Sequence, residues 1–173
     1  EGTFVLITEV DTSGSTTTVS IDNCFTSTYR NYFITLEDLS ITNSSSKLQF
    51  GFRTGGGSGS AGGNNMGGAL QGYLGDDSAI TETAVNVGVV TIMTPTYQND
   101  DFALQMWVFS PQASSERSTI SGRSVYREGS TSNVGFNDFG FMSISTETHT
   151  GFTIKSNSAN LNAGGKIKVY GIK

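Results

Sequence analysis

Residues 102–109 have the sequence FALQMWVF, and this stretch decides the fold class. Alternate positions of an extended chain point to opposite faces of a sheet, so each face of this stretch can be examined separately. One face consists of Leu104, Met106 and Val108. The other face contains Trp107 and Phe109. The pattern predicts a central β-strand. Both of its faces are apolar, and a sheet with one face in water would leave the second apolar face exposed.

Period-2 alternation recurs along the rest of the chain and predicts about ten strands in all. In the segment Tyr29–Thr42 the apolar positions change phase at Glu37 and Asp38, which predicts a β-bulge. The aromatic residues of that segment also fit a helical spacing, but their β-branched neighbours favour a strand. The other expected strands are Thr3–Val10, Thr16–Asp22, Lys47–Arg53, Val85–Val89, Arg117–Glu128, Phe139–Ser145, Gly151–Ser156 and Lys166–Ile172.

The two ends of the chain carry particular strand patterns. Thr3–Val10 is apolar on both faces, as in a strand that is buried on two sides or paired with another subunit. In the last expected strand Ile167, Val169 and Gly171 face inward, while the lysines and the tyrosine between them face outward. This pattern predicts that the C-terminus is held in the sheet.

The composition supports an all-β chain. The 173 residues include 23 Ser, 22 Thr, 22 Gly and 12 Asn, a mixture poor in helix formers and rich in turn and strand-surface residues. The 11 Phe and 6 Tyr residues argue against disorder. We therefore expect residues 1–173 to form a single domain, an antiparallel β-sandwich of the jelly-roll type.

One segment does not fit the sandwich. Ten of the 21 residues in Gly55–Gly75 are glycine, which is too flexible for a core and too long for a simple hairpin. We expect an excursion from the sheet over residues 54–75, either as a surface loop or as an element that packs against a neighbouring subunit. The candidate apolar contacts with a partner are Met66, Leu70, Tyr73 and Leu74.

Charge and cysteine content exclude several classes of function. The net charge is −5 and the basic residues are scattered, so neither nucleic acid nor an anionic membrane is an expected partner. No apolar run approaches the roughly 18 residues of a membrane span, and the start lacks a secretion-signal pattern, so we expect a soluble, mature chain. Cys24 is the only cysteine, which excludes an intrachain disulfide and suggests a small buried side chain.

Catalytic patterns are weak in this sequence. His149 is the only histidine, and it lies in a Thr-rich segment without a nucleophile elbow, so we expect an exposed loop residue rather than a catalytic base. The glycines at Gly57, Gly59 and Gly62 match a dinucleotide-binding spacing, but no helix pattern follows them. We expect neither an enzyme nor a bound organic cofactor.

Two kinds of binding site stay open. Asp100 and Asp101, beside Asn99, are candidate calcium ligands because calcium prefers oxygen donors, and the pair Asp76 and Asp77 is similar. Such adjacent carboxylates are more often solvated turn residues. Aromatic side chains can stack on sugar rings, although most at alternate strand positions belong to a core. The tyrosines concerned are Tyr29, Tyr32, Tyr73, Tyr97 and Tyr126.

Two motifs resemble a known group of proteins. The first follows F-x-S-x-Y-x-N-Y-x-I, with Phe25, Ser27, Tyr29, Asn31, Tyr32 and Ile34. The second follows G-x-I-x-V-Y-G-hydrophobic-K, with Gly165, Ile167, Val169, Tyr170, Gly171, Ile172 and Lys173. Together they cover about a fifth of the chain. They resemble small β-sandwich proteins of tailed bacteriophages, especially aquatic ones.

The resemblance implies a structural protein on the virion surface, either a head-decoration protein or the knob of a tail fibre or spike. Such proteins assemble as symmetric homo-oligomers, so the expected partners are further copies of the chain, as a homotrimer, and other capsid or tail proteins. No catalytic residues accompany the resemblance. The alternative function is a carbohydrate-binding module that recognises host-surface glycans through aromatic side chains in its loops. A third hypothesis is a small hydrolase.

Overall fold

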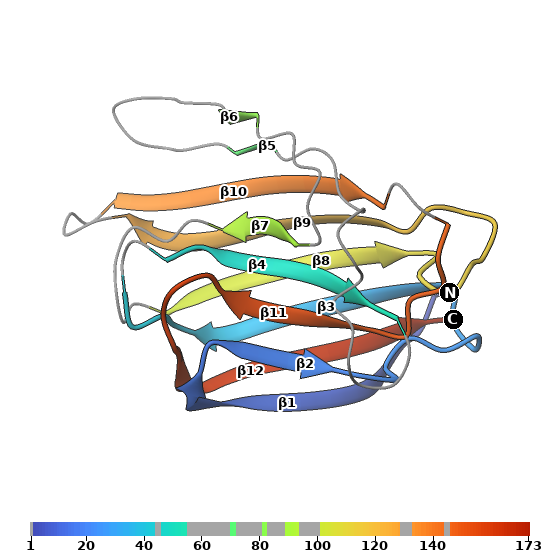
Figure 1. Cartoon of the computed structure of the whole chain (residues 1–173), viewed down its shortest axis with the longest axis horizontal. Helices are drawn as coiled ribbons and strands as arrows, with labels where there is room; N and C mark the ends of the chain where they lie inside the picture. The colour runs from blue at the N-terminus through green and yellow to red at the C-terminus, as the bar shows by residue number, and fades with distance from the viewer. Residues whose placement is uncertain are drawn as a thin grey trace.

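The computed structural model describes residues 2–43, 46–54, 70–71, 81–82, 89–93, 101–128, 133–143 and 146–173. Two antiparallel sheets pack face to face, and Figure 1 shows the smaller sheet in front of the larger one. The six-stranded sheet has the spatial order β1 (Phe4–Thr16), β12 (Leu161–Ile172), β3 (Asn31–Leu39), β8 (Phe102–Phe109), β9 (Thr119–Glu128) and β10 (Asn133–Met142). The four-stranded sheet has the order β2 (Thr18–Ile21), β11 (Gly151–Ser156), β4 (Leu48–Arg53) and β7 (Val90–Met93).

The strand order confirms a jelly roll. The chain crosses between the sheets as it runs from β1 to β2, from β2 to β3 and from β3 to β4, and again from β7 to β8. The order β1-β12-β3-β8 therefore faces the order β2-β11-β4-β7, which is the arrangement of two Greek keys in an eight-stranded jelly roll. Strands β9 and β10 extend the first sheet beyond β8, and the short strands β5 (Leu70–Gln71) and β6 (Thr81–Glu82) pair with each other.

The alternation of β8 is as the sequence predicts. Leu104, Met106 and Val108 are buried between the sheets, while Trp107 and Phe109 are exposed on the outer face. Strand β8 lies between β3 and β9, so it is a central strand. The last strand is confirmed as well, because β12 pairs with β1 on one side and with β3 on the other.

The predicted bulge is present in β3. The register with β8 shifts between Leu36 and Leu39, and Asp38 adopts a φ of 51°. Aspartate tolerates this left-handed conformation better than most residues. Tyr32, Ile34 and Leu36 are buried at alternate positions. Leu39 is buried as well, although it lies three positions after Leu36, because the register shift turns it to the same face.

The structure corrects the first of two expectations for β1. This strand forms the edge of the six-stranded sheet and is not buried on two sides, since Phe4 and Leu6 are 51% and 52% exposed. An edge strand has a neighbour on one side only, so its outward side chains gain cover from one strand instead of two. The second expectation, pairing with another subunit, stays a prediction.

Candidate functional site

The outer face of the six-stranded sheet carries a contiguous group of large apolar side chains. The strand registers align Leu6 with Tyr170, Tyr170 with Phe33, and Phe33 with Trp107, so one row crosses four strands. We call this group the aromatic band, and it consists of Phe4, Leu6, Phe33, Trp107, Phe109 and Tyr170. Strands that are far apart in the sequence contribute to it, because β12 and β3 insert between β1 and β8.

The rings of the aromatic band contact one another. The ring centroids of Phe33 and Trp107 lie 4.9 Å apart, and Phe4 lies 5.5 Å from Phe33 and 5.9 Å from Trp107. Tyr170 lies 6.3 Å from Phe4 with its ring nearly perpendicular. These tilted and edge-on arrangements are the favourable ones for aromatic pairs. The band is therefore a packed unit, even though it faces away from the core.

Much of the aromatic band is accessible to solvent. Trp107 and Phe109 are each 37% exposed. Since a large aromatic side chain offers about 150–250 Å², the whole band exposes on the order of 400 Å². That area matches the largest apolar patches of monomeric proteins, which are often functional.

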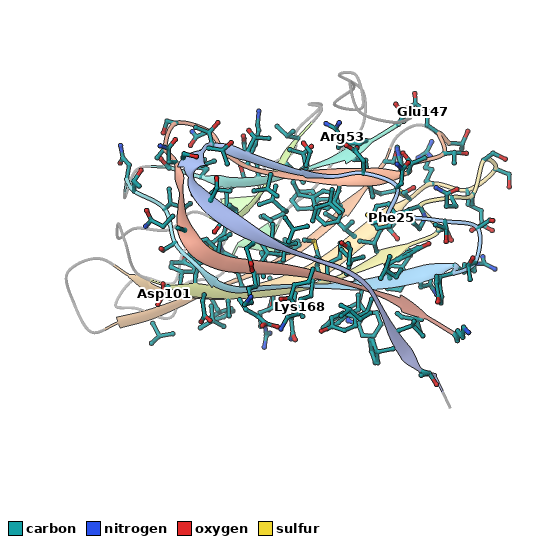
Figure 2. The ribbon with its side chains drawn as sticks, turned by 90° about the horizontal axis from the view of Figure 1, so that it is seen from below. Phe25, Arg53, Asp101, Glu147 and Lys168 are labelled. Atoms are coloured by element: carbon teal, nitrogen blue, oxygen red, sulfur yellow. The ribbon has the colours of Figure 1, made fainter. Side chains whose placement is uncertain are left out.

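A row of ion pairs borders the aromatic band on the same face. Lys168 donates to Glu37 at 2.6 Å, and Arg123 donates to both carboxylate oxygens of Asp138 at 2.5 and 2.7 Å. Figure 2 shows Lys168 on the side of the six-stranded sheet that faces away from the other sheet. The hydrogen bond from Lys168 lowers the pKa of Glu37, and that from Arg123 lowers the pKa of Asp138. We call Glu37, Lys168, Arg123 and Asp138 the charged row.

A second feature lies at one end of the sandwich, where two loops meet. The loop before β3 contributes Tyr29 and Arg30, and the loop after β8 contributes Ser110, Gln112 and Glu116. These residues surround a hollow of about 310 Å³, which we call the end hollow. Arg30 donates from Nη2 to both carboxylate oxygens of Glu116 at 3.0 Å, and Ser110 donates to Glu116 at 2.9 Å. Sequence reasoning missed this site because Arg30 and Glu116 are 86 residues apart.

The structure bears only partly on the candidate calcium ligands. Asp101 is exposed just before β8, and Figure 2 shows it at an end of the sandwich. Asp100, Asp76 and Asp77 lie outside the described residues. Within the described part of the chain no group of three or more His, Cys, Asp or Glu residues lies close enough to hold a metal ion.

Most of the Gly-rich segment also lies outside the described residues. This applies to Met66, Tyr73 and Leu74, the candidate partner contacts, whereas Leu70 is placed in β5 and pairs with Glu82 of β6. Among the tyrosines, Tyr32 and Tyr126 are buried in the core and Tyr29 is half-buried at the end hollow. Tyr73 and Tyr97 fall outside the described ranges.

The structure contradicts the expectation that His149 is exposed. Its side chain is fully buried and stacks on Phe52, with ring centroids 4.3 Å apart and an angle of 5° between the planes. The backbone of His149 is held on both sides, because its amide donates to the Pro111 carbonyl at 2.7 Å and Gln112 donates to its carbonyl. Burial lowers the pKa of His149 to about 4. The polar Thr-rich sequence around it concealed this packing.

Cys24 is buried, as its sequence context predicts. Its side chain is 2% exposed, and Sγ lies 3.7 Å from the Ile21 carbonyl. Burial raises the pKa of the thiol to about 12. The residue therefore acts as a small core side chain and not as a nucleophile.

The two motifs that carry the bacteriophage resemblance form one structural unit. Strands β3 and β12 pair so that Tyr32 lies opposite Gly171 and Ile34 lies opposite Val169. The Tyr29 ring covers Gly171, where a Cβ atom would come within 2.5 Å of it. The Tyr32 hydroxyl donates to the Thr26 carbonyl and accepts from the Thr26 amide, which fixes the loop between Phe25 and Tyr29. These motifs build the fold at the end where the end hollow lies.

Comparison with known proteins gives no relative. Neither a family model, nor a curated protein, nor a solved structure matches this chain.

Proposed function

We propose that the chain is a non-enzymatic structural protein of a bacteriophage particle, displayed on the particle surface, and that it assembles into a symmetric homo-oligomer through the aromatic band. The resemblance of the two motifs supports the particle assignment, as a head-decoration protein or as the knob of a tail fibre or spike. The proposed assembly rests on one observation, the exposed aromatic band.

The chemistry of the aromatic band favours a protein partner. Aromatic residues and their apolar neighbours are enriched in the cores of protein interfaces, whereas the rims are polar. Here the rings of Phe4, Phe33 and Trp107 are flanked by the charged row on the same face. Because Lys168 and Arg123 are already paired within the chain, they can border an interface without an unpaired buried charge.

The aromatic band is of a size to form the centre of an interface between copies of the chain. A stable interface buries about 800 Å² on each partner, and the band alone supplies roughly half of that. The contact must therefore extend over the charged row and the flanking strands. A three-fold axis beside the band would let each copy cover the rings of its neighbours in a closed assembly.

The single tryptophan gives a direct test. Trp107 is the only tryptophan of the chain and lies in the aromatic band, so its fluorescence reports whether the band is covered. We expect emission at short wavelength and weak quenching by acrylamide in the assembled protein. Dilution should shift the emission to longer wavelength and increase the quenching.

Two matched variants make this test specific. Leu6→Glu places a charge in the aromatic band on β1, three strands away from Trp107, and Val134→Glu places the same charge on an exposed position of β10 outside the band. The Leu6→Glu protein should show at every concentration the quenching that the unchanged chain shows only on dilution, whereas Val134→Glu should behave as the unchanged chain. The proposal is wrong if Trp107 of the unchanged chain is freely quenched at all concentrations, or if both variants behave alike.

A further inference from the structure

Hydrogen bonds hold the two loops that line the end hollow. The Ser110 amide donates to the Arg30 carbonyl at 3.0 Å, which joins the two loops. Ser110 itself adopts a φ of 51°, a conformation that costs energy and is often kept at functional sites. Gln112 donates to the carbonyls of Phe25 and His149, so it anchors the second loop to the core. Walls held in this way lose little freedom when a ligand binds.

The charged groups of the end hollow are Arg30 and Glu116, and both are accessible. Their side chains are 73% and 48% exposed, so the ion pair adds little to the stability of the fold. A guanidinium has five N–H donors, and within the described residues Arg30 donates from Nη2 alone, to Glu116. Donors of Arg30 and acceptor oxygens of Glu116 therefore lie side by side at the opening of the hollow.

This pairing fits neighbouring hydroxyl groups. Each hydroxyl of a sugar both donates and accepts a hydrogen bond, so two adjacent hydroxyls can donate to a carboxylate and accept from a guanidinium. Because Arg30 and Glu116 cancel each other's charge, the site favours a neutral ligand over an anion. Hydrogen bonds to charged groups are stronger than those between neutral groups, so a small site of this kind can select its ligand.

Tyr29 supplies an aromatic surface beside this pair. A Cβ atom added to Gly171 would lie 2.5 Å from Cγ of Tyr29 and at similar distances from both Cδ atoms, so one face of the ring lies on β12. The ring also lies 6.0 Å from that of Tyr32, which fixes its position, and Tyr29 lines the end hollow. The apolar face of a pyranose ring stacks on aromatic rings of this kind.

We propose that the end hollow binds a neutral saccharide, with one sugar ring against Tyr29 and two adjacent hydroxyls on Arg30 and Glu116. The volume of about 310 Å³ falls at the small end of the range for ligand pockets, which suits one or two sugar rings. The site does not depend on self-association, since a single chain supplies Tyr29, Arg30 and Glu116.

Saturation-transfer difference NMR tests this proposal, because it reads the signals of the sugar and works for a monomer or an oligomer. The probes are D-glucose, D-galactose, D-mannose and N-acetyl-D-glucosamine, each titrated separately. At least one should give a saturable signal. Glu116→Gln and Arg30→Gln should each weaken binding by about tenfold or more, since each removes a charged hydrogen-bond partner.

The charged row offers a matched control. Asp138 pairs with Arg123 as Glu116 pairs with Arg30, and both pairs are exposed on the same scaffold. Asp138→Asn should leave sugar binding unchanged. The proposal is overturned if none of the four sugars gives a signal, or if Glu116→Gln and Asp138→Asn bind sugar equally well. Neither result bears on the fluorescence of Trp107, so the two proposals fail separately.

Discussion

Replacing Gly171 by alanine tests how the two motif segments pack. The added Cβ atom would lie 2.5, 2.6 and 2.7 Å from Cγ, Cδ2 and Cδ1 of Tyr29. Carbon atoms prefer separations of about 3.5–4.0 Å, so the ring must move by about 1 Å. Overpacking of this kind costs about 1–3 kcal/mol. Alanine recovers about 0.4–1 kcal/mol by restricting the unfolded chain. We therefore expect a net destabilisation of about 1–2 kcal/mol.

Urea unfolding followed by circular dichroism measures this change, and Gly140→Ala is the matched control. An added Cβ atom at Gly140 would have only the Ile120 carbonyl within reach, at 3.9 Å, so this variant should be as stable as the unchanged chain or slightly more so. In a double-mutant cycle, Tyr29→Ala should cost less in the Gly171→Ala background, because the clash is gone. Equal stability of Gly171→Ala and Gly140→Ala would refute the packing argument.

Two further predictions concern buried groups. Burial lowers the pKa of His149 to about 4, below its value of 6.5 in the unfolded chain, so the unfolded state binds more protons between these values and stability falls as the pH falls through this window. Between pH 6.5 and 5 the loss should be about 1.6 kcal/mol, and His149→Phe should remove it. A free energy of unfolding in urea that is the same at both pH values would count against the buried neutral imidazole. Cys24, whose pKa is raised to about 12, should react with a disulfide reagent about a thousandfold more slowly in the native protein than in urea, and rapid native labelling would contradict its burial.

The strands with clear alternation could be predicted from the sequence. Gly151–Ser156 matches β11 at both ends, and the separation of Trp107 from Leu104 and Met106 onto opposite faces of β8 is correct. The first residues of the strands were harder to predict. Strand β10 begins at Asn133 and β12 at Leu161, several residues before the expected Phe139 and Lys166. Small and polar residues such as Gly135, Asn137 and Gly164 interrupt the apolar pattern in these extra lengths, where backbone pairing extends the strand.

The candidate sites depend on strand order, which alternation does not encode. The sequence separates the two faces of β8, but Phe33 contacts Trp107 only because β3 lies beside β8, and Tyr170 joins them because β12 lies beside β3. In the same way, Arg30 and Glu116 meet because the start of β3 pairs with the end of β8, which brings the loop before β3 next to the loop after β8. His149 was misjudged because a polar segment can still bury one side chain when its backbone is bound on both sides.

The native mass of the purified chain, measured by light scattering, tests the central claim most directly. One chain has a mass of 18.3 kDa, so a homotrimer held together through the aromatic band would give about 55 kDa. We predict this mass, or that of a larger closed assembly, under conditions in which Trp107 is protected from solvent. A mass of 18.3 kDa at every concentration would contradict the account.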